Sequence, residues 1–324
     1  MRQNKVFIYG ITLVATLGGL LFGYDTAVIS GAEKSIQAFL IDSQGLSSFL
    51  HGVTVSSALI GCIVGGAISG FVSSAYGRKY ALIIAGVLFF LSALGSGNPE
   101  FLFFNKGEPS MGLLWMFNLY RVIGGVGVGL ASAVCPMYIG EIAPAEIRGR
   151  LVSLNQFAII FGMLIVYFVN WGIADGQTIE WINEIGWRRM FLSEALPAAV
   201  FISLMFLVPE SPRYLALKQK DTEALSILTR VNGVEKAKQI LEDIKSTVET
   251  SKVKLYSYGK AVLIIGILLS VFQQFVGINV ALYYAPRIFE SMGAAKDASM
   301  LQTIIMGLVN VVFTVVAILT VDKW

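Results

Sequence analysis

The stretch from residue 6 to residue 24, VFIYGITLVATLGGLLFGY, contains no charged side chain. A helix of about 20 apolar residues is long enough to cross the hydrocarbon core of a bilayer. Seven further runs of similar character follow, at residues 52–77, 80–99, 122–140, 151–174, 195–209, 261–286 and 298–321. The pattern predicts an all-α membrane protein with eight transmembrane helices.

The composition agrees with this interpretation. Hydrophobic residues make up 56% of the 324 residues and charged residues 14%, whereas soluble proteins carry about 25% charged residues. The first apolar run is too long for a secretory signal peptide and is followed directly by Asp25. Cys62 and Cys135 fall inside predicted spans, where we interpret them as packing residues rather than a disulfide or a metal pair. No cofactor is expected.

Basic residues gather on one side of the predicted spans. The side of the N-terminus holds Arg78, Lys79, Arg148, Arg150 and the basic residues of 213–260. The other side holds only Lys34, Lys106, Arg188, Arg189, Arg287 and Lys296. Because cytoplasmic loops carry the excess of Lys and Arg, we expect a multi-pass protein of the cell (inner) membrane with a cytoplasmic N-terminus.

The order of the spans suggests two unequal parts. Six spans occupy residues 1–209, a polar linker follows at 210–257, and two more spans fill 258–324. In the linker, Asp221 is expected to cap a short helix that ends at Asn232 and Gly233, and a second amphipathic helix is expected at about 235–248. We expect both helices to pack under the bundle; a solvated linker is the alternative. Six spans, a linker and further spans are typical of transporters built from two halves.

Two opposite charges lie in different predicted spans, Asp25 in the first and Arg121 near the outer end of the fourth. A charge inside a membrane costs about 2.5–3.5 kcal/mol on insertion scales, so such residues are usually paired or functional. A carboxylate that binds a proton would release its arginine, which makes this pair a candidate proton switch. A static salt bridge is the alternative interpretation.

The seventh span contains a cluster of amides and aromatics within QQFVGIN, residues 273–279, followed by Tyr283. Unpaired amides in hydrocarbon cost several kcal/mol each. Gly277 should weaken the helix locally, so that Gln274, Asn279 and Tyr283 can converge on one cavity. Uncharged donors and acceptors beside aromatics suit a neutral polyhydroxylated solute, and Gln156 adds another amide. Hydrogen bonds between helices without a ligand are the alternative.

Other patterns argue against an enzyme. Glycines at 61, 65, 125 and 129 have the spacing that lets membrane helices approach closely. The run 124–129 lacks the preceding strand of a dinucleotide loop. His51 is the only histidine and is expected at the surface, so neither a Ser–His–acid set nor a Cys/His metal spacing is present.

Several motifs together resemble the sugar porter family of the major facilitator superfamily. They are GYDT at 23–26, GRK at 77–79, Arg121, PMYIGE at 136–141, RGR at 148–150, PESPR at 209–213 and the 273–279 run. The similarity spans the whole chain, and PESPR together with QQFVGIN is a highly specific combination. It implies a major facilitator fold, with eight helices present of an expected twelve.

The resemblance also implies roles for residues. It assigns proton coupling to Asp25, Arg121 and Glu194, and contacts with a sugar to Phe22, Gln156, Gln273, Gln274, Asn279 and Tyr283. It assigns an inner-gate charge network to Arg78, Glu141, Arg148, Glu210 and Arg213.

The expected function is import of a monosaccharide, with D-xylose the favoured substrate, by proton symport in the lipid bilayer. We expect a monomer that binds no nucleic acid. A facilitative hexose or pentose uniporter and a non-transporting sugar sensor are the alternatives. Because the sequence stops where a spanning helix should reach the cytoplasm, we also expect it to be an incomplete portion that cannot complete a transport cycle alone.

Overall fold

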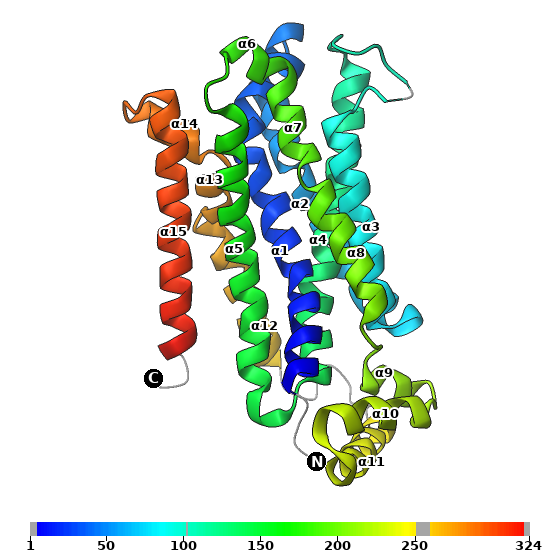
Figure 1. Ribbon diagram of the computed structural model, residues 1–324. Helices are drawn as coiled ribbons and strands as arrows, with labels where there is room; N and C mark the ends of the chain where they lie inside the picture. The colour runs from blue at the N-terminus through cyan, green and yellow to red at the C-terminus, as the bar shows by residue number, and fades with distance from the viewer. Residues whose placement is uncertain (1–4, 102, 251–259, 321–324) are drawn as a thin grey trace.

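The computed structural model describes residues 5–101, 103–250 and 260–320, and all regular structure within these ranges is helical (Figure 1). Eight segments of the described residues are long and apolar enough to cross a membrane, which confirms the predicted fold class. The bundle carries short polar helices at one end, here named the linker end; the opposite end is named the far end. The expected boundary at 257–258 and the final residues 321–324 lie outside the described residues.

The first five spans are single long helices. They are α1 (Lys5–Ile36), α2 (Ser48–Tyr76), α3 (Arg78–Gly97), α4 (Met111–Ile142) and α5 (Arg148–Ala174). A π turn at Gln37–Ile41 and a 3-10 turn at Asp42–Gln44 extend α1, and a 3-10 turn at Ala145–Ile147 leads into α5. The sixth span is broken into α6 (Ile179–Trp181), a π turn (Ile182–Gly186), α7 (Trp187–Leu192) and α8 (Ala195–Leu207).

The start of α4 corrects one expectation. The apolar run that predicts this helix begins at residue 122, which puts Arg121 near its end, but the helix begins at Met111. At a rise of 1.5 Å per residue, Arg121 lies about 15 Å inside the helix. The helix extends further because Leu113, Leu114 and Phe117 are buried against the other helices.

The linker forms α9 (Pro212–Leu217), α10 (Asp221–Asn232) and α11 (Val234–Thr250). Buried apolar side chains of all three make one small core, which confirms that they are packed helices. Arg230 of α10 lies 3.9 Å from the ring centroid of Phe7 in α1, so the linker helices contact the bundle. Gly233, with φ +84°, follows α10 as expected. The expected cap by Asp221 is wrong, because Asp221 is the first helical residue and its carboxylate pairs with Lys245.

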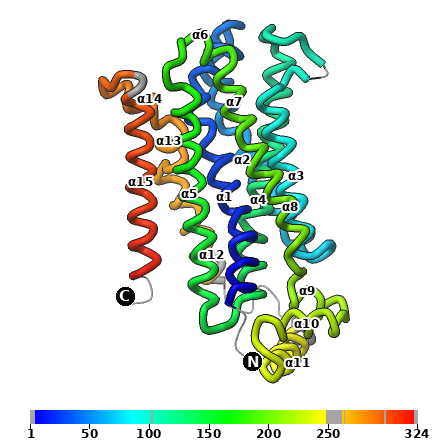
Figure 2. Tube along the Cα trace, in the orientation of Figure 1, coloured from blue at the N-terminus to red at the C-terminus, as the bar shows by residue number. Residues whose placement is uncertain are grey.

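The remaining helices are α12 (Lys260–Phe275), α13 (Ile278–Tyr283), α14 (Ala285–Ser291) and α15 (Lys296–Thr320). The trace in Figure 2 shows α15 beside α5, and α13 and α14 pack on α1. The seventh span is interrupted at Gly277, which has φ +79° and separates α12 from α13. The local weakening expected at this glycine is therefore confirmed.

Helices α2 and α4 pack backbone against backbone. A Cβ atom added at Gly61 would lie 2.0 Å from the carbonyl oxygen of Val122, and one at Gly125 would lie 1.9 Å from that of Ala58. Any side chain at either position would therefore push the helices apart. The close packing predicted from the glycine spacing is confirmed.

We expect Gly61→Ala to lower the apparent unfolding temperature of the purified protein in detergent, since overpacking costs about 1–3 kcal/mol. Gly66→Ala on the same helix is the matched control, because a Cβ there meets nothing within 4 Å. Equal thermal midpoints for the two variants would contradict the packing described here.

Candidate functional site

The centre of the bundle contains a buried ion pair between α1 and α4. Nη1 of Arg121 donates to Oδ1 of Asp25 at 2.6 Å, and Nη2 donates to the Asp25 carbonyl oxygen at 3.1 Å. Both residues are 1% exposed. The guanidinium also lies 5.2 Å from the ring centroid of Phe191 in α7. The pairing predicted for these two charges, which lie in different spans, is thus a direct contact in the structure.

A second buried acid lies beside the pair. Glu194 separates α7 from α8 and is fully buried. It is close enough to interact electrostatically with both Asp25 and Arg121, and its carboxyl group lies within hydrogen-bonding reach of the Asp25 carboxyl group. The Asp25 and Glu194 carboxyl groups therefore lie together beside one guanidinium.

The amides predicted to bind a sugar are brought together in part. Across the break at Gly277, Nδ2 of Asn279 donates to Oε1 of Gln274 at 2.8 Å. Gln273 and Gln274 are exposed and Asn279 is half-buried. Their polar atoms are thus available to a solute, and the helix break turns α13 toward α1.

The other predicted sugar residues surround the same region of the bundle. Tyr283 of α13 is 6% exposed, packs in the core with Tyr24, and lies in electrostatic range of Asp25 and Arg121. Phe22 is half-buried on α1. Gln156 of α5 is exposed, and among the described residues no hydrogen bond joins it to the amides of α12 and α13.

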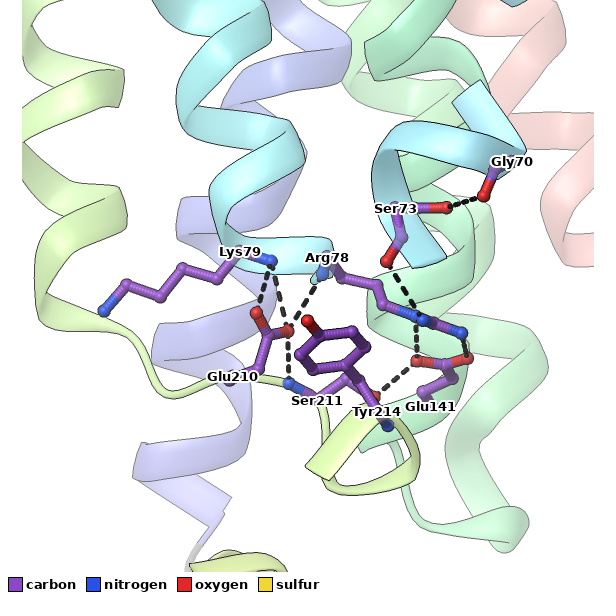
Figure 3. A network of polar contacts seen from close by, with 8 residues as sticks. All are labelled: Gly70, Ser73, Arg78, Lys79, Glu141, Glu210, Ser211 and Tyr214. Atoms are coloured by element: carbon purple, nitrogen blue, oxygen red, sulfur yellow. Dashed lines mark hydrogen bonds and ion pairs between the residues drawn. The ribbon is translucent and has the colours of Figure 1, made fainter. Parts of the chain in front are cut away.

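At the linker end, a second polar network ties α3 and α4 to α9 (Figure 3). Nε and Nη2 of Arg78 each donate to Glu141 at 2.8 Å, which is a bidentate pair. Nη1 of Arg78 donates to the carbonyl oxygen of Ser73 at 3.2 Å, and the Ser211 hydroxyl donates to Glu141. Three of the predicted network residues, Arg78, Glu141 and Glu210, are thus in one cluster.

Glu210 caps the N-terminus of α3. Its Oε1 accepts from the backbone N–H groups of Arg78 at 3.0 Å, Lys79 at 3.1 Å and Ser211 at 2.7 Å. A carboxylate is favoured there because the first N–H groups of a helix lack partners within it. Burial raises the pKa of the Glu210 carboxyl, and these backbone hydrogen bonds oppose the increase. Gly77 is required beside it, because φ is +97° and a Cβ would lie 2.2 Å from Oε2 of Glu210.

Arg148 and Arg213 are not part of this hydrogen-bonded cluster. Both are exposed, and they line, together with Glu141 and Asp243, a cavity of about 300 Å³ between the end of α4 and the linker helices. Within the described part of the chain, neither arginine forms an ion pair. Both arginines thus lie beside the charge network to which they were predicted to belong, but among the described residues they form no ion pair with it.

The far end holds a charge cluster that sequence reasoning missed. Glu33 of α1 is fully buried, with Oε1 3.0 Å from Nε of Arg287 in α14 and Oε2 3.4 Å from Nε2 of His51 in α2. Lys34 forms an ion pair with Glu290 of α14. The expected surface position of His51 is wrong, because it is 5% exposed and also contacts the carbonyl oxygen of Glu33 at 3.2 Å.

Some of the missed residues left a sequence signal. Ser211 precedes a proline at the first position of α9 and accepts from the backbone N–H of Tyr214, as a serine N-cap does. Glu33 and Lys34 were read as loop charges because the first apolar run ends at residue 24. Arg287 and Glu290, which pair with Glu33 and Lys34, lie more than 200 positions away, so no local pattern could pair them. His51, the other neighbour of Glu33, lies 18 positions away.

Comparisons with known proteins identify the family of the chain. The profile of the family described as "Sugar (and other) transporter" matches residues 11–324. The D-xylose-proton symporter of Escherichia coli (strain K12) is 51% identical over 337 residues, covering 100% of this chain and 68% of the symporter. The arabinose-proton symporter of Bacillus subtilis (strain 168) is 41% identical over 322 residues, covering 98% of this chain and 66% of that protein.

A solved structure gives the same result. The major facilitator superfamily proton:xylose symporter XylE bound to 6-bromo-6-deoxy-D-glucose is 50% identical, with a TM-score of 0.91 over 99% of this chain and 70% of that chain. The chain thus spans about two-thirds of the length of the curated relatives named above.

Replacing Arg78 should destabilise the linker end. We expect Arg78→Gln to lower the apparent unfolding temperature in detergent clearly, because it leaves a largely buried Glu141 without its cation, and breaking a buried pair costs about 3–5 kcal/mol. Lys79→Gln is the control, since its exposed side chain bonds only the Phe206 carbonyl oxygen. If Lys79→Gln proves as harmful as Arg78→Gln, the bidentate pair is not what holds this end together.

Proposed function

We take as our premise that the chain belongs to the family of sugar transporters, and we propose that it carries a monosaccharide, D-xylose foremost, across the cell membrane together with a proton. The observation that supports proton coupling best is the buried contact between Asp25 and Arg121 at 2.6 Å. The D-xylose-proton symporter at 51% identity supports the choice of substrate.

The ion pair provides the proton switch. An ionised Asp25 neutralises Arg121 in a region where an unpaired charge is costly. A proton on Asp25 removes that attraction and leaves the guanidinium with Glu194 and the aromatic face of Phe191 as its neighbours. The proton therefore changes which contacts hold α1 and α4 together.

Sugar binding connects to this switch through the seventh span. Gln274 and Asn279 present amides next to the break at Gly277, and Tyr283, less than two turns beyond it, lies in electrostatic range of Asp25 and Arg121. A sugar that engages the amides would shift α13 against α1. In this proposal the coupling of sugar to proton passes through the electrostatic interaction of Tyr283 with the ion pair.

The proposed orientation puts the linker end in the cytoplasm. It holds Arg78, Lys79, Arg148, Arg150 and the basic residues of α9–α11, as the positive-inside rule requires of a cytoplasmic side. Residues 1–209 then form one half of the transporter, and 258–324 belong to the other. Arg78, Glu141 and Glu210, together with Arg148 and Arg213 at the adjoining cavity, act at the inner gate of a monomeric protein.

Asp25→Asn should abolish proton coupling. In energy-depleted cells, adding D-xylose should alkalinise the medium with the parent protein and not with the variant, whose uptake should stop at equilibrium across the membrane. Sugar counterflow, which needs no net proton movement, should persist. Asp175→Asn, at an exposed residue of the far end, is the control. Undiminished accumulation by Asp25→Asn would exclude the switch, and a parent that takes up xylose without alkalinisation would be a uniporter.

Asn279→Ala should weaken sugar binding. Losing one hydrogen bond to a sugar hydroxyl costs about 0.5–1.5 kcal/mol, so we expect KM for uptake to rise by up to about tenfold. Ser270→Ala on the neighbouring α12 is the control, because that hydroxyl already donates to the Gly266 carbonyl oxygen. An unchanged KM together with a lowered unfolding temperature would assign Asn279 a purely structural role.

A further inference from the structure

Two buried serine side chains of α3 lie away from the amides of the seventh span. Ser92 is 1% exposed and Ser96 0%. The proposed function uses neither of them. Hydroxyl groups placed in an otherwise apolar interface are costly unless they have hydrogen-bond partners.

The packing of the helices places Ser92 next to the ion pair. A Cβ added at Gly124 would lie 2.4 Å from Oγ of Ser92 and 3.2 Å from Oδ1 of Asp25, so both oxygens adjoin the same point. The serine hydroxyl of α3 and the carboxylate of α1 therefore meet the same turn of α4, where Gly124 has no side chain; Arg121, one turn away on α4, donates to the same Oδ1.

Ser96 continues from that point toward the far end. Helix α3 runs from the linker end at Arg78 to the far end at Gly97, so Ser96 lies one turn, about 6 Å, beyond Ser92. Helix α4 runs in the opposite sense, and a Cβ at Gly95 would touch the ring of Tyr120, so this turn of α3 also packs on α4. Further out, Arg188 of α7 pairs with Glu100 at 2.5 Å, with both residues 7% exposed.

The hydroxyl oxygens of Ser92 and Ser96 have no hydrogen-bond partner in the described part of the chain. Buried serines elsewhere behave differently. The hydroxyls of Ser30 and Ser57 each donate to a carbonyl oxygen three residues earlier, at 2.8 Å. The hydroxyl groups of Ser92 and Ser96 do not form such a local hydrogen bond to a backbone carbonyl oxygen.

We propose that Ser96 and Ser92 mark a proton route from the far end to Asp25 and Glu194, separate from the path of the sugar. Bridging water molecules, which buried polar groups ordinarily bind, complete the chain. At each step one O–H bond forms as the next one breaks, and the proton ends on a carboxylate oxygen.

The architecture separates this route from the sugar residues. Helix α3 packs on α4, α7 and α8, whereas α13 packs on α1, and Figure 1 shows α1 between α3 and α13. Asp25 on α1 is thus approached by protons from one side and by the sugar-contacting helix from the other. The charged or titratable groups facing Asp25 are Arg121, Glu194, Cys62 and Tyr283.

The test rests on the proposed proton coupling and compares two assays in vesicles containing the protein. Xylose-driven proton entry requires the route, whereas xylose counterflow does not. For the double variant Ser92→Ala/Ser96→Ala, we expect proton entry to fall by about tenfold or more at alkaline external pH, where protons are scarce, and less at acidic pH. Counterflow should stay at the parent level.

Controls separate the possible failures. Ser57→Ala removes a buried hydroxyl that is locally bonded on α2 and should change neither assay. Ser92→Thr keeps a hydroxyl and should retain proton entry. Equal losses in both assays would mean a structural role, and unchanged proton entry at every pH would mean that protons arrive by the sugar path; either result overturns the route. A parent protein without xylose-driven proton entry would instead refute the proposed symport.

Discussion

The rest of the structure depends on one contact, the pairing of Asp25 with Arg121 in the middle of an apolar bundle. Each charge is tolerated only because the other is within hydrogen-bond distance, so α1 and α4 must keep their register. The surrounding elements follow from this requirement. Gly124 lets α3 and α1 approach α4, Phe191 covers the guanidinium, and the break before α8 brings Glu194 close to both charges.

The two ends of the bundle are held by charges in different ways. At the linker end, Arg78, Glu141 and Glu210 join α3, α4 and α9, so all of these contacts lie before residue 214. At the far end, Glu33 and Lys34 of α1 contact Arg287 and Glu290 of α14. The far-end cluster therefore joins the first six spans to the seventh by ion pairs, in addition to the packing of α13 on α1. A movement of α14 away from α1 must break ion pairs, one of which includes a fully buried carboxylate.

Much of the fold could be predicted from the sequence because the signals are local. A spanning helix is a run of apolar residues, the αL break at Gly277 needs a glycine, and the linker helices show their own apolar faces. The pairing of Asp25 with Arg121 could be inferred because few charges lie within the spans. The positions of Glu33 and Arg287 could not be inferred, since they depend on how far α1 continues beyond its apolar run and on a contact across more than 200 residues. His51 lies only 18 positions from Glu33, but its contact with Glu33 depends on the same extension of α1. The unpartnered hydroxyls of Ser92 and Ser96 likewise have no sequence signal, because serine occurs in many helices with its hydrogen bonds satisfied.

The backbone contact between α2 and α4 has a mechanical consequence. With no side chain between Gly61 and the Val122 carbonyl, or between Gly125 and the Ala58 carbonyl, these helices cannot slide without separating. Helices α2 and α4 are therefore expected to move together as one rigid unit. The seventh span is less rigid, because its helix is interrupted at Gly277, where the backbone can bend at low cost. Bending is therefore expected at α13, near Asp25 and Arg121, rather than within the first six spans.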